Sequence, residues 1–192
     1  MPEREAADVP TEDPRPQELR RASSLVLVNT GPGKGKTSAA MGVVMRSVGR
    51  GWPVAVVQFL KSGKWHTGEE KVGKQLGVDW WALGEGFTWD SSDLTVDQAV
   101  AAEAWRHAAR VIAAGAHQLV LLDEVTYPVN WGWIDIDDVV AAITSRPSAV
   151  NVILTGRNAP QALVDIADTV TEMAEVKHAY KAGIRAKKGI DY

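Results

Sequence analysis

Short apolar runs alternate along the chain with stretches that have helical spacing. Runs that are apolar on both faces and separated by helices are typical of a mainly parallel sheet covered on both sides. The pattern therefore predicts one doubly wound α/β domain, in which ligands bind at the carboxyl ends of the strands. The predicted strands are residues 24–29, 54–59, 78–83, 118–123, 151–156 and 169–173.

Two helices can be placed from local signals. Residues 95–98, Thr-Val-Asp-Gln, form a capping-box pattern that opens the longest helix, and Gly115 can close it. A shorter helix is predicted to begin at Asp135 and to end before Pro147.

Residues 1–22 differ in composition from the rest of the chain. They hold four of the nine prolines, many charges and almost no large apolar side chains. We expect a flexible N-terminal tail over residues 1–22 and one folded domain over residues 23–192.

Composition excludes several classes of function. The 21 basic and 24 acidic residues give a formal net charge of −3, and no basic aromatic stripe occurs, so a nucleic-acid partner is not expected. The absence of cysteine excludes disulfides, thiolate metal sites and cysteine nucleophiles. No segment has the apolar length of a signal peptide or a membrane span, so we expect a cytoplasmic protein with no membrane partner.

A phosphate-binding motif follows the first predicted strand. Its sequence, TGPGKGKT (30–37), opens a predicted helix, as a phosphate loop requires. Glycine amides and the helix N-terminus attract anions, Lys36 adds positive charge, and the Thr37 hydroxyl can ligate Mg²⁺. Thr30 stands where the usual motif has its first glycine. The predicted nucleotide-binding residues are Thr30, Gly31, Gly33, Lys34, Gly35, Lys36, Thr37 and Ser38.

The strand over residues 118–123 leads into Asp123-Glu124. Carboxylates at this position can bind Mg²⁺ directly or through water, and the alternative is a helix cap or a salt bridge at the strand end. Together with Thr37, Glu124 and Asp123 form the predicted metal site.

Two large aromatics, Phe87 and Trp89, lie beside glycines in a predicted loop near the same edge. They suit a platform for a flat ligand, and residue type alone leaves a small apolar core equally open.

From about Leu25 to Tyr192 the sequence resembles the ATP:corrinoid adenosyltransferases of cobalamin biosynthesis and salvage. Several motifs in the same order carry this resemblance, and Thr30 is itself part of the family pattern. The motifs are TGPGKGKT (30–37), VQFLK (57–61), GFTW (86–89), LLDEVTY (121–127), LTGRNAP (154–160), ADTVTEM (167–173), VKHAYKAG (176–183) and KKGIDY (187–192).

The resemblance implies a P-loop NTPase fold of the RecA-like type and an alkyl transfer. In the family, Co(I) of a reduced corrinoid attacks the 5′-carbon of ATP and expels inorganic triphosphate. Phe87 and Trp89 match the aromatics that pack below the corrin ring and displace its lower ligand, and Glu124 matches a magnesium-associated carboxylate. The resemblance also implies ATP as co-substrate, Mg²⁺ or Mn²⁺, a flavin-dependent reductant and a homodimer.

Several residues stay open. Arg157 is equally consistent with a ligand contact and with a structural hydrogen bond. Trp131 and Trp133 suit packing better than a corrinoid contact. Lys177 and His178 lie in a basic terminal segment that favours a solvated face, and His66 and His107 lack metal-ligand spacing.

Two other functions fit the phosphate loop. A P-loop ATPase or kinase would cleave at phosphorus and would ordinarily show an arginine finger or a catalytic base. A nucleotide-gated corrinoid carrier would bind both ligands without forming triphosphate.

Overall fold

The computed structural model describes residues 13, 16, 18–61, 67–84 and 94–191. Its centre is one sheet with the strand order β3-β2-β4-β5-β1-β6, and every neighbouring pair is parallel. The parallel α/β fold predicted from the apolar runs is therefore confirmed. The strands are β1 (Val26–Thr30), β2 (Val54–Gln58), β3 (Asp79–Ala82), β4 (Leu119–Asp123), β5 (Asn151–Thr155) and β6 (Thr169–Glu172).

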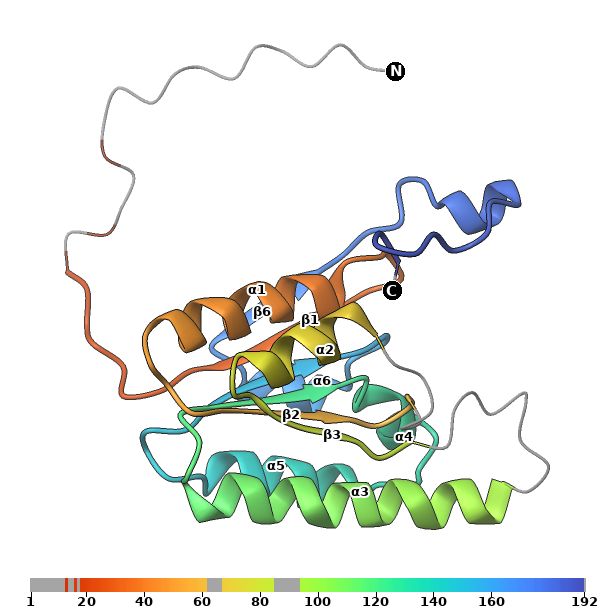
Figure 1. Cartoon of the computed structure of the whole chain (residues 1–192). Helices are drawn as coiled ribbons and strands as arrows, with labels where there is room; N and C mark the ends of the chain where they lie inside the picture. Colours follow the sequence, from red (N-terminus) through yellow and green to blue (C-terminus); the bar gives the residue numbers. More distant parts are fainter. Residues whose placement is uncertain (1–12, 14–15, 17, 62–66, 85–93, 192) are drawn as a thin grey trace.

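Helices cover both faces of this sheet, with α1 and α2 on one side and α3 and α5 on the other (Figure 1). The short α4 follows β4, and a 3₁₀ helix, η2, lies in the segment after β6. The helices are α1 (Lys36–Gly49), α2 (Gly68–Gln75), α3 (Leu94–Ala114), α4 (Thr126–Asn130), α5 (Ile136–Thr144), α6 (Gln161–Ile166) and η2 (Ala179–Ala182).

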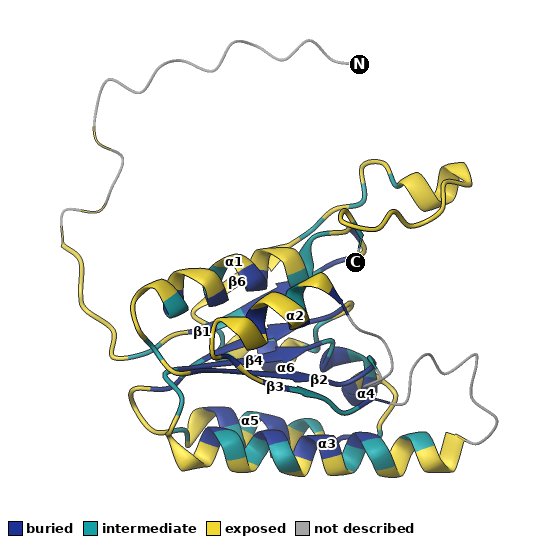
Figure 2. Ribbon diagram, in the orientation of Figure 1, coloured by how far each residue is buried: buried dark blue, intermediate teal, exposed yellow. Residues whose placement is uncertain are grey.

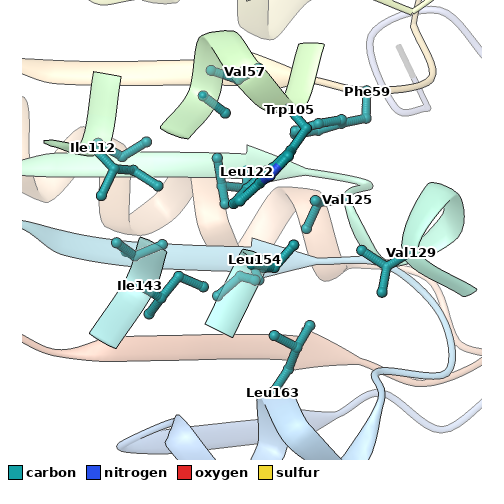
Figure 3. Packing of buried hydrophobic residues seen from close by; sticks show 14 of the residues in the cluster. Val57, Phe59, Trp105, Ile112, Leu122, Val125, Val129, Ile143, Leu154 and Leu163 are labelled. Atoms are coloured by element: carbon teal, nitrogen blue, oxygen red, sulfur yellow. The ribbon is translucent and has the colours of Figure 1, made fainter. Parts of the chain in front are cut away.

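Each face of the sheet has its own apolar core. Leu122 and Leu154 pack with Trp105 of α3 and Ile143 of α5 on one face (Figure 3). Leu121 points to the other face, into a second cluster with residues of α1. The middle strands are thus buried on both sides, which explains why their sequences read as continuous apolar runs. Figure 2 shows the contrast between the buried strands and the exposed outer faces of the helices.

The local signals placed the helix ends better than the start of the longest helix. Helix α3 already includes Leu94 and Thr95 among the described residues, so Thr95 lies within the helix and not before it, as the predicted capping box required. Gly115 follows the end of α3 with a left-handed φ of 65°. Asp135 caps α5, because its side chain accepts a hydrogen bond of 2.9 Å from the Asp137 amide. The helix ends at Thr144, before Pro147, as predicted.

The proposed flexible tail over residues 1–22 lies mostly outside the described residues and stays a prediction. Within the described part of the chain, no helix combines the length and apolar character needed to cross a membrane.

Candidate functional site

The phosphate loop, residues 30–37, connects β1 to α1 and is closed by the end of β6. The Gly33 amide donates to the Met173 carbonyl at 2.6 Å, and the Met173 amide donates to the Thr30 carbonyl at 2.9 Å. A Cβ on Gly33 would lie only 2.6 Å from that Met173 oxygen. Gly31 and Gly35 have φ values of 97° and 114°, which favour glycine. The glycines of the motif are therefore required by this backbone path.

Lys36 is the first residue of α1 and folds back over the loop. Its Nζ donates to the carbonyls of Gly31 at 2.9 Å and Gly33 at 2.6 Å. Burial lowers the pKa of Lys36, the charge of Arg157 lowers it further, and the carboxylate of Glu124 opposes the shift. A cation thus lies against the same loop whose amides and helix N-terminus attract anions.

Two of the predicted nucleotide-binding side chains, those of Lys34 and Ser38, are exposed. Lys34 is exposed and forms an ion pair with Asp191 near the C-terminus. Ser38 is exposed in the first turn of α1.

Thr30 connects the phosphate loop to the segment after β5. Its hydroxyl accepts a hydrogen bond of 3.0 Å from the Ala159 amide. A glycine at this position would lack that acceptor. The departure of this residue from the usual motif thus has a structural reason.

Asp123, the last residue of β4, lies inside the protein with both carboxylate oxygens in use. Its Oδ1 accepts from the hydroxyls of Thr37 and Thr155, each at 2.8 Å. Its Oδ2 accepts from the Gln58 amide at 2.9 Å and lies 3.5 Å from Lys61 Nζ. This carboxylate is therefore held by hydrogen bonds from three elements other than its own strand.

Glu124 follows directly, in a left-handed conformation with φ of 64° that few non-glycine residues adopt. Its amide donates to the Thr155 hydroxyl at 2.9 Å. Burial and the adjacent Asp123 carboxylate raise the pKa of Glu124 to about 7, whereas Lys61 and Lys36 act in the opposite direction. Two neighbouring carboxylates, Asp123 buried and Glu124 partly buried, create a site that a cation would stabilise.

Arg157 is exposed on the loop after β5, and its backbone is firmly held. Its carbonyl accepts from Thr126 Oγ1 at 2.8 Å and from Asn130 Nδ2 at 3.2 Å. A Cβ on the preceding Gly156 would lie 2.0 Å from Thr126 Oγ1. The loop backbone is thus fixed, and Arg157 is exposed yet near enough for its charge to lower the pKa of Lys36.

The predicted corrinoid aromatics, Phe87 and Trp89, lie outside the described residues. Gly84, the last described residue before them, donates its amide hydrogen to the Lys61 carbonyl at 3.1 Å. The Lys61 side chain also reaches Asp123, so Gly84 is connected through Lys61 to the carboxylate pair.

Trp131 and Trp133 pack against each other, with ring centroids 4.7 Å apart. Trp131 also contacts Tyr127, at 5.8 Å between centroids. Burial and the charge of Glu124 raise the pKa of Tyr127. Trp131 is 39% exposed, so the three rings form a cluster at the surface, and the predicted core or interface packing of the two tryptophans stays a prediction.

The histidines show structural contacts. His107 packs edge-on against Trp81 at 4.6 Å, and burial lowers its pKa. His178 caps the short 3₁₀ helix η2 by accepting a hydrogen bond from the Tyr180 amide at 3.2 Å. Lys177 is exposed in the same segment, and His66 lies outside the described residues.

Sequence reasoning missed the partners of Asp123, namely Gln58, Lys61 and Thr155. A signal was available, because Gln58 and Thr155 each end an apolar run, as Asp123 does. In parallel strands such polar endings meet at one edge, and Gln58 indeed pairs with Asp123 in register.

Comparison with known proteins identifies close relatives over most of the chain. Residues 22–192 match the family described as ATP:corrinoid adenosyltransferase BtuR/CobO/CobP. A corrinoid adenosyltransferase of Escherichia coli strain K12 is 42% identical over 180 residues, which cover 94% of this chain and 91% of the relative. The corrinoid adenosyltransferase of Pseudomonas aeruginosa is 43% identical over 94% of this chain and 89% of its own length.

Among solved structures, a KaiC-like protein from Pyrococcus horikoshii has a similar fold. It aligns with a TM-score of 0.50 and 18% sequence identity, covering 80% of this chain and 73% of the archaeal one. At this identity the similarity concerns the fold alone.

Proposed function

The chain belongs to the ATP:corrinoid adenosyltransferase family and catalyses the ATP-dependent adenosylation of corrinoids; we propose how its residues support that reaction. The 5′-deoxyadenosyl group of ATP is transferred to Co(I) of a reduced corrinoid, and inorganic triphosphate leaves. The reaction serves adenosylcobalamin biosynthesis or salvage.

One observation carries this proposal. The phosphate loop, with Lys36 folded over it, lies at the same sheet edge as the Asp123 and Glu124 carboxylates. Thr37 joins the two parts, because it follows Lys36 and donates its hydroxyl hydrogen to Asp123. An anion site thus adjoins a cation site, as binding of a metal-bound polyphosphate requires.

The bond changes balance without a protein nucleophile. The electron pair of Co(I) forms the cobalt–carbon bond, the bond from the 5′-carbon to oxygen breaks, and its electron pair leaves with triphosphate. The loop amides and Lys36 stabilise the negative charge that gathers on this leaving group. The remaining acceleration comes from aligning the cobalt, the 5′-carbon and the leaving oxygen.

The donor set fits Mg²⁺ or Mn²⁺ carried by ATP. Thr37 uses its hydrogen on Asp123, which leaves its oxygen lone pairs available, and Glu124 adds a carboxylate. Asp123 orients Thr37, since protein donors already contact both of its oxygens. Among the described residues no group of three or more His, Asp or Glu is placed to hold a metal alone. A metal at this position would therefore be held by Thr37 and Glu124 together with the phosphates of ATP. The bound metal would neutralise charge on the leaving triphosphate.

The residues proposed to bind the corrinoid are taken from the family resemblance of the sequence. Phe87 and Trp89 pack below the corrin ring and displace the lower axial ligand, and Arg157 contacts a phosphate or a corrin amide. Removing the axial donor lowers the energy of the cobalt orbital that accepts the electron, so weak reductants can form Co(I). Apolar rings also exclude water, the natural replacement ligand.

A flavin-dependent reductant and a homodimer belong to the proposal on the basis of the family resemblance. A cytoplasmic location agrees with the absence of cysteine from the sequence. Size-exclusion chromatography with light scattering tests the dimer directly.

The decisive experiment mixes the protein, ATP, Mg²⁺ and chemically reduced cobalamin without oxygen, and identifies both products by mass spectrometry and phosphorus NMR. We expect adenosylcobalamin and triphosphate in equal amounts, and a loss of about 100-fold in Lys36→Ala. ADP and phosphate without alkylated cobalt would mean phosphorus chemistry. Binding of both ligands without products would mean a carrier.

A second experiment tests the aromatic loop. Trp89→Ala should impair turnover of Co(II) corrinoid, supplied with a reductant, much more than turnover of pre-reduced Co(I). Equal losses with both forms would reject the ligand-displacement role.

A further inference from the structure

Gln58 lies between a tryptophan and the buried carboxylate of the site. Its side-chain oxygen accepts a hydrogen bond of 3.0 Å from Trp80 Nε1, and its Nε2 donates to Asp123 Oδ2 at 2.9 Å. Gln58 is 2% exposed, Trp80 is 8% exposed and Asp123 is fully buried. The three side chains form a continuous chain of hydrogen bonds inside the protein, from β3 through β2 to β4.

The chemistry of its neighbours allows only one orientation of the Gln58 amide. The indole N–H of Trp80 can only donate, and an ionised Asp123 can only accept. An amide satisfies both, with its oxygen toward Trp80 and its nitrogen toward Asp123. A glutamate at position 58 would place a carboxylate against Asp123, and an apolar residue would leave the buried indole and carboxylate each without this partner.

Gln58 also affects the phosphate loop, because Asp123 contacts both Gln58 and Thr37. With Oδ2 held by Gln58, Oδ1 faces the hydroxyls of Thr37 and Thr155, each at 2.8 Å. Thr37 therefore donates its hydrogen toward Asp123, and its lone pairs remain for another partner. If the carboxylate could rotate, the Thr37 hydrogen would lose its fixed acceptor.

We propose that Gln58 is a positioning residue for the metal–nucleotide complex. By fixing the Asp123 carboxylate, it keeps the Thr37 hydroxyl oriented to accept the metal ion that accompanies ATP. Gln58 contacts Asp123 and acts through it and Thr37. This inference rests on the metal site of the proposed function, and it adds a residue of β2 that no phosphate-loop motif contains.

The Gln58 backbone makes a separate hydrogen bond. Its carbonyl accepts from the amide of Leu83, the residue after β3, at 3.0 Å. That contact uses the backbone and survives side-chain substitution. A change of the Gln58 side chain thus tests the amide bridge to Asp123 and leaves the backbone bond to Leu83 in place.

The test compares ATP binding with and without metal. Isothermal titration calorimetry on the full chain gives the ATP Kd in Mg²⁺ and in EDTA. The Kd in EDTA divided by the Kd in Mg²⁺ measures how much the metal strengthens ATP binding. We expect Gln58→Met, which keeps length and apolar bulk, to reduce this ratio about tenfold, because a hydrogen bond to a charged group is lost. The Kd in EDTA should change less than about twofold.

Val56→Ala is the matched control. Val56 is fully buried on the same strand and the same face of the sheet, in an apolar cluster with Trp80. Its truncation should lower the thermal midpoint and leave the metal-dependent ratio unchanged. Parallel weakening of both Kd values in Gln58→Met would show a general structural role and overturn the proposal.

Trp80→Phe provides a second test should Gln58→Met not fold. It removes the donor to the Gln58 oxygen while Gln58 still faces Asp123, so the ratio should fall in the same direction and by less. An unchanged ratio in this variant would also overturn the proposal. If the ATP Kd of the wild type does not depend on Mg²⁺, both the metal site of the proposed function and the Gln58 role are rejected. If the wild-type Kd depends on Mg²⁺ and the variants keep the wild-type ratio, only the Gln58 role is rejected.

Discussion

The hydroxyl of Thr30 offers a quantitative test of why the phosphate loop departs from the usual motif. Thr30→Val keeps the β-branched shape and removes the acceptor for the Ala159 amide, now bonded at 3.0 Å. A neutral hydrogen bond contributes about 1 kcal/mol, and a buried donor left without a partner costs about 1–3 kcal/mol. Because the contact is partly buried, we expect a loss of about 1–2 kcal/mol in unfolding free energy.

The assay is urea unfolding followed by tryptophan fluorescence, with thermal melts in parallel. For a chain of this length the expected loss corresponds to a fall of roughly 3–6 °C in Tm. Thr30→Ser retains the hydroxyl and should stay closer to the wild type. Thr30→Gly restores the common motif residue, yet it should be the least stable of the three, because glycine in a strand costs a further ~0.5–1 kcal/mol.

The order of stability among these variants shows whether the Thr30 hydroxyl holds the segment after β5. If Thr30→Val is as stable as the wild type, the hydroxyl does not hold the segment after β5. If Thr30→Ser loses as much as Thr30→Val, the methyl group contributes as much to stability as the hydrogen bond, and the hydroxyl alone does not explain the residue.

Three further predictions concern the site. Gly33→Ala places a Cβ 2.6 Å from the Met173 carbonyl oxygen, so it should weaken ATP binding at least about tenfold by calorimetry, and a wild-type Kd would contradict the loop geometry. Because the pKa of Glu124 is raised to about 7, the folded protein without metal binds more protons than the unfolded chain between about pH 4.5 and 7. Its unfolding free energy in EDTA should therefore fall as pH rises through that range, and Glu124→Gln should flatten the slope; equal slopes would refute the assignment. Asp191→Asn frees Lys34 from its ion pair and should tighten ATP binding by about two- to fivefold at low salt and less at high salt, whereas weaker binding would show that Asp191 supports the site.

Much of the fold was predictable because the sheet is parallel and covered. Strands such as β4 are buried on both faces, so their sequences are apolar throughout and stand out from the rest of the chain. The capped helix α5 was predictable for a local reason, since Asp135 lies directly before its first turn.

The short helices were not predicted, because tertiary contacts define them. Helix α4 has five residues and contains a proline, and its position follows from the contact of Thr126 with Gly156 and Arg157. Helix α2 buries only Glu70 and Gly73, so no apolar stripe marks it in the sequence.

The candidate site divides in the same way. Lys36, Thr37 and Asp123 were predictable because a motif fixes their spacing and a strand end brings them together. The sequence marks Gln58 only as a polar residue at a strand end and does not mark Met173, because their contacts depend on β2 lying beside β4 and on β6 lying beside β1. Strand order is decided by packing between distant segments, and local sequence does not report it.

The closure of the phosphate loop by Met173 has a consequence for how the protein is made. During synthesis residues 30–37 leave the ribosome well before β5 and β6, the two neighbours of β1. Until then β1 has two unpaired edges, and the loop lacks its hydrogen bonds to Met173. Non-local pairing of this kind makes folding slow and exposes the nascent chain to aggregation. The phosphate loop therefore reaches its final hydrogen-bonded form only after β6 has been made.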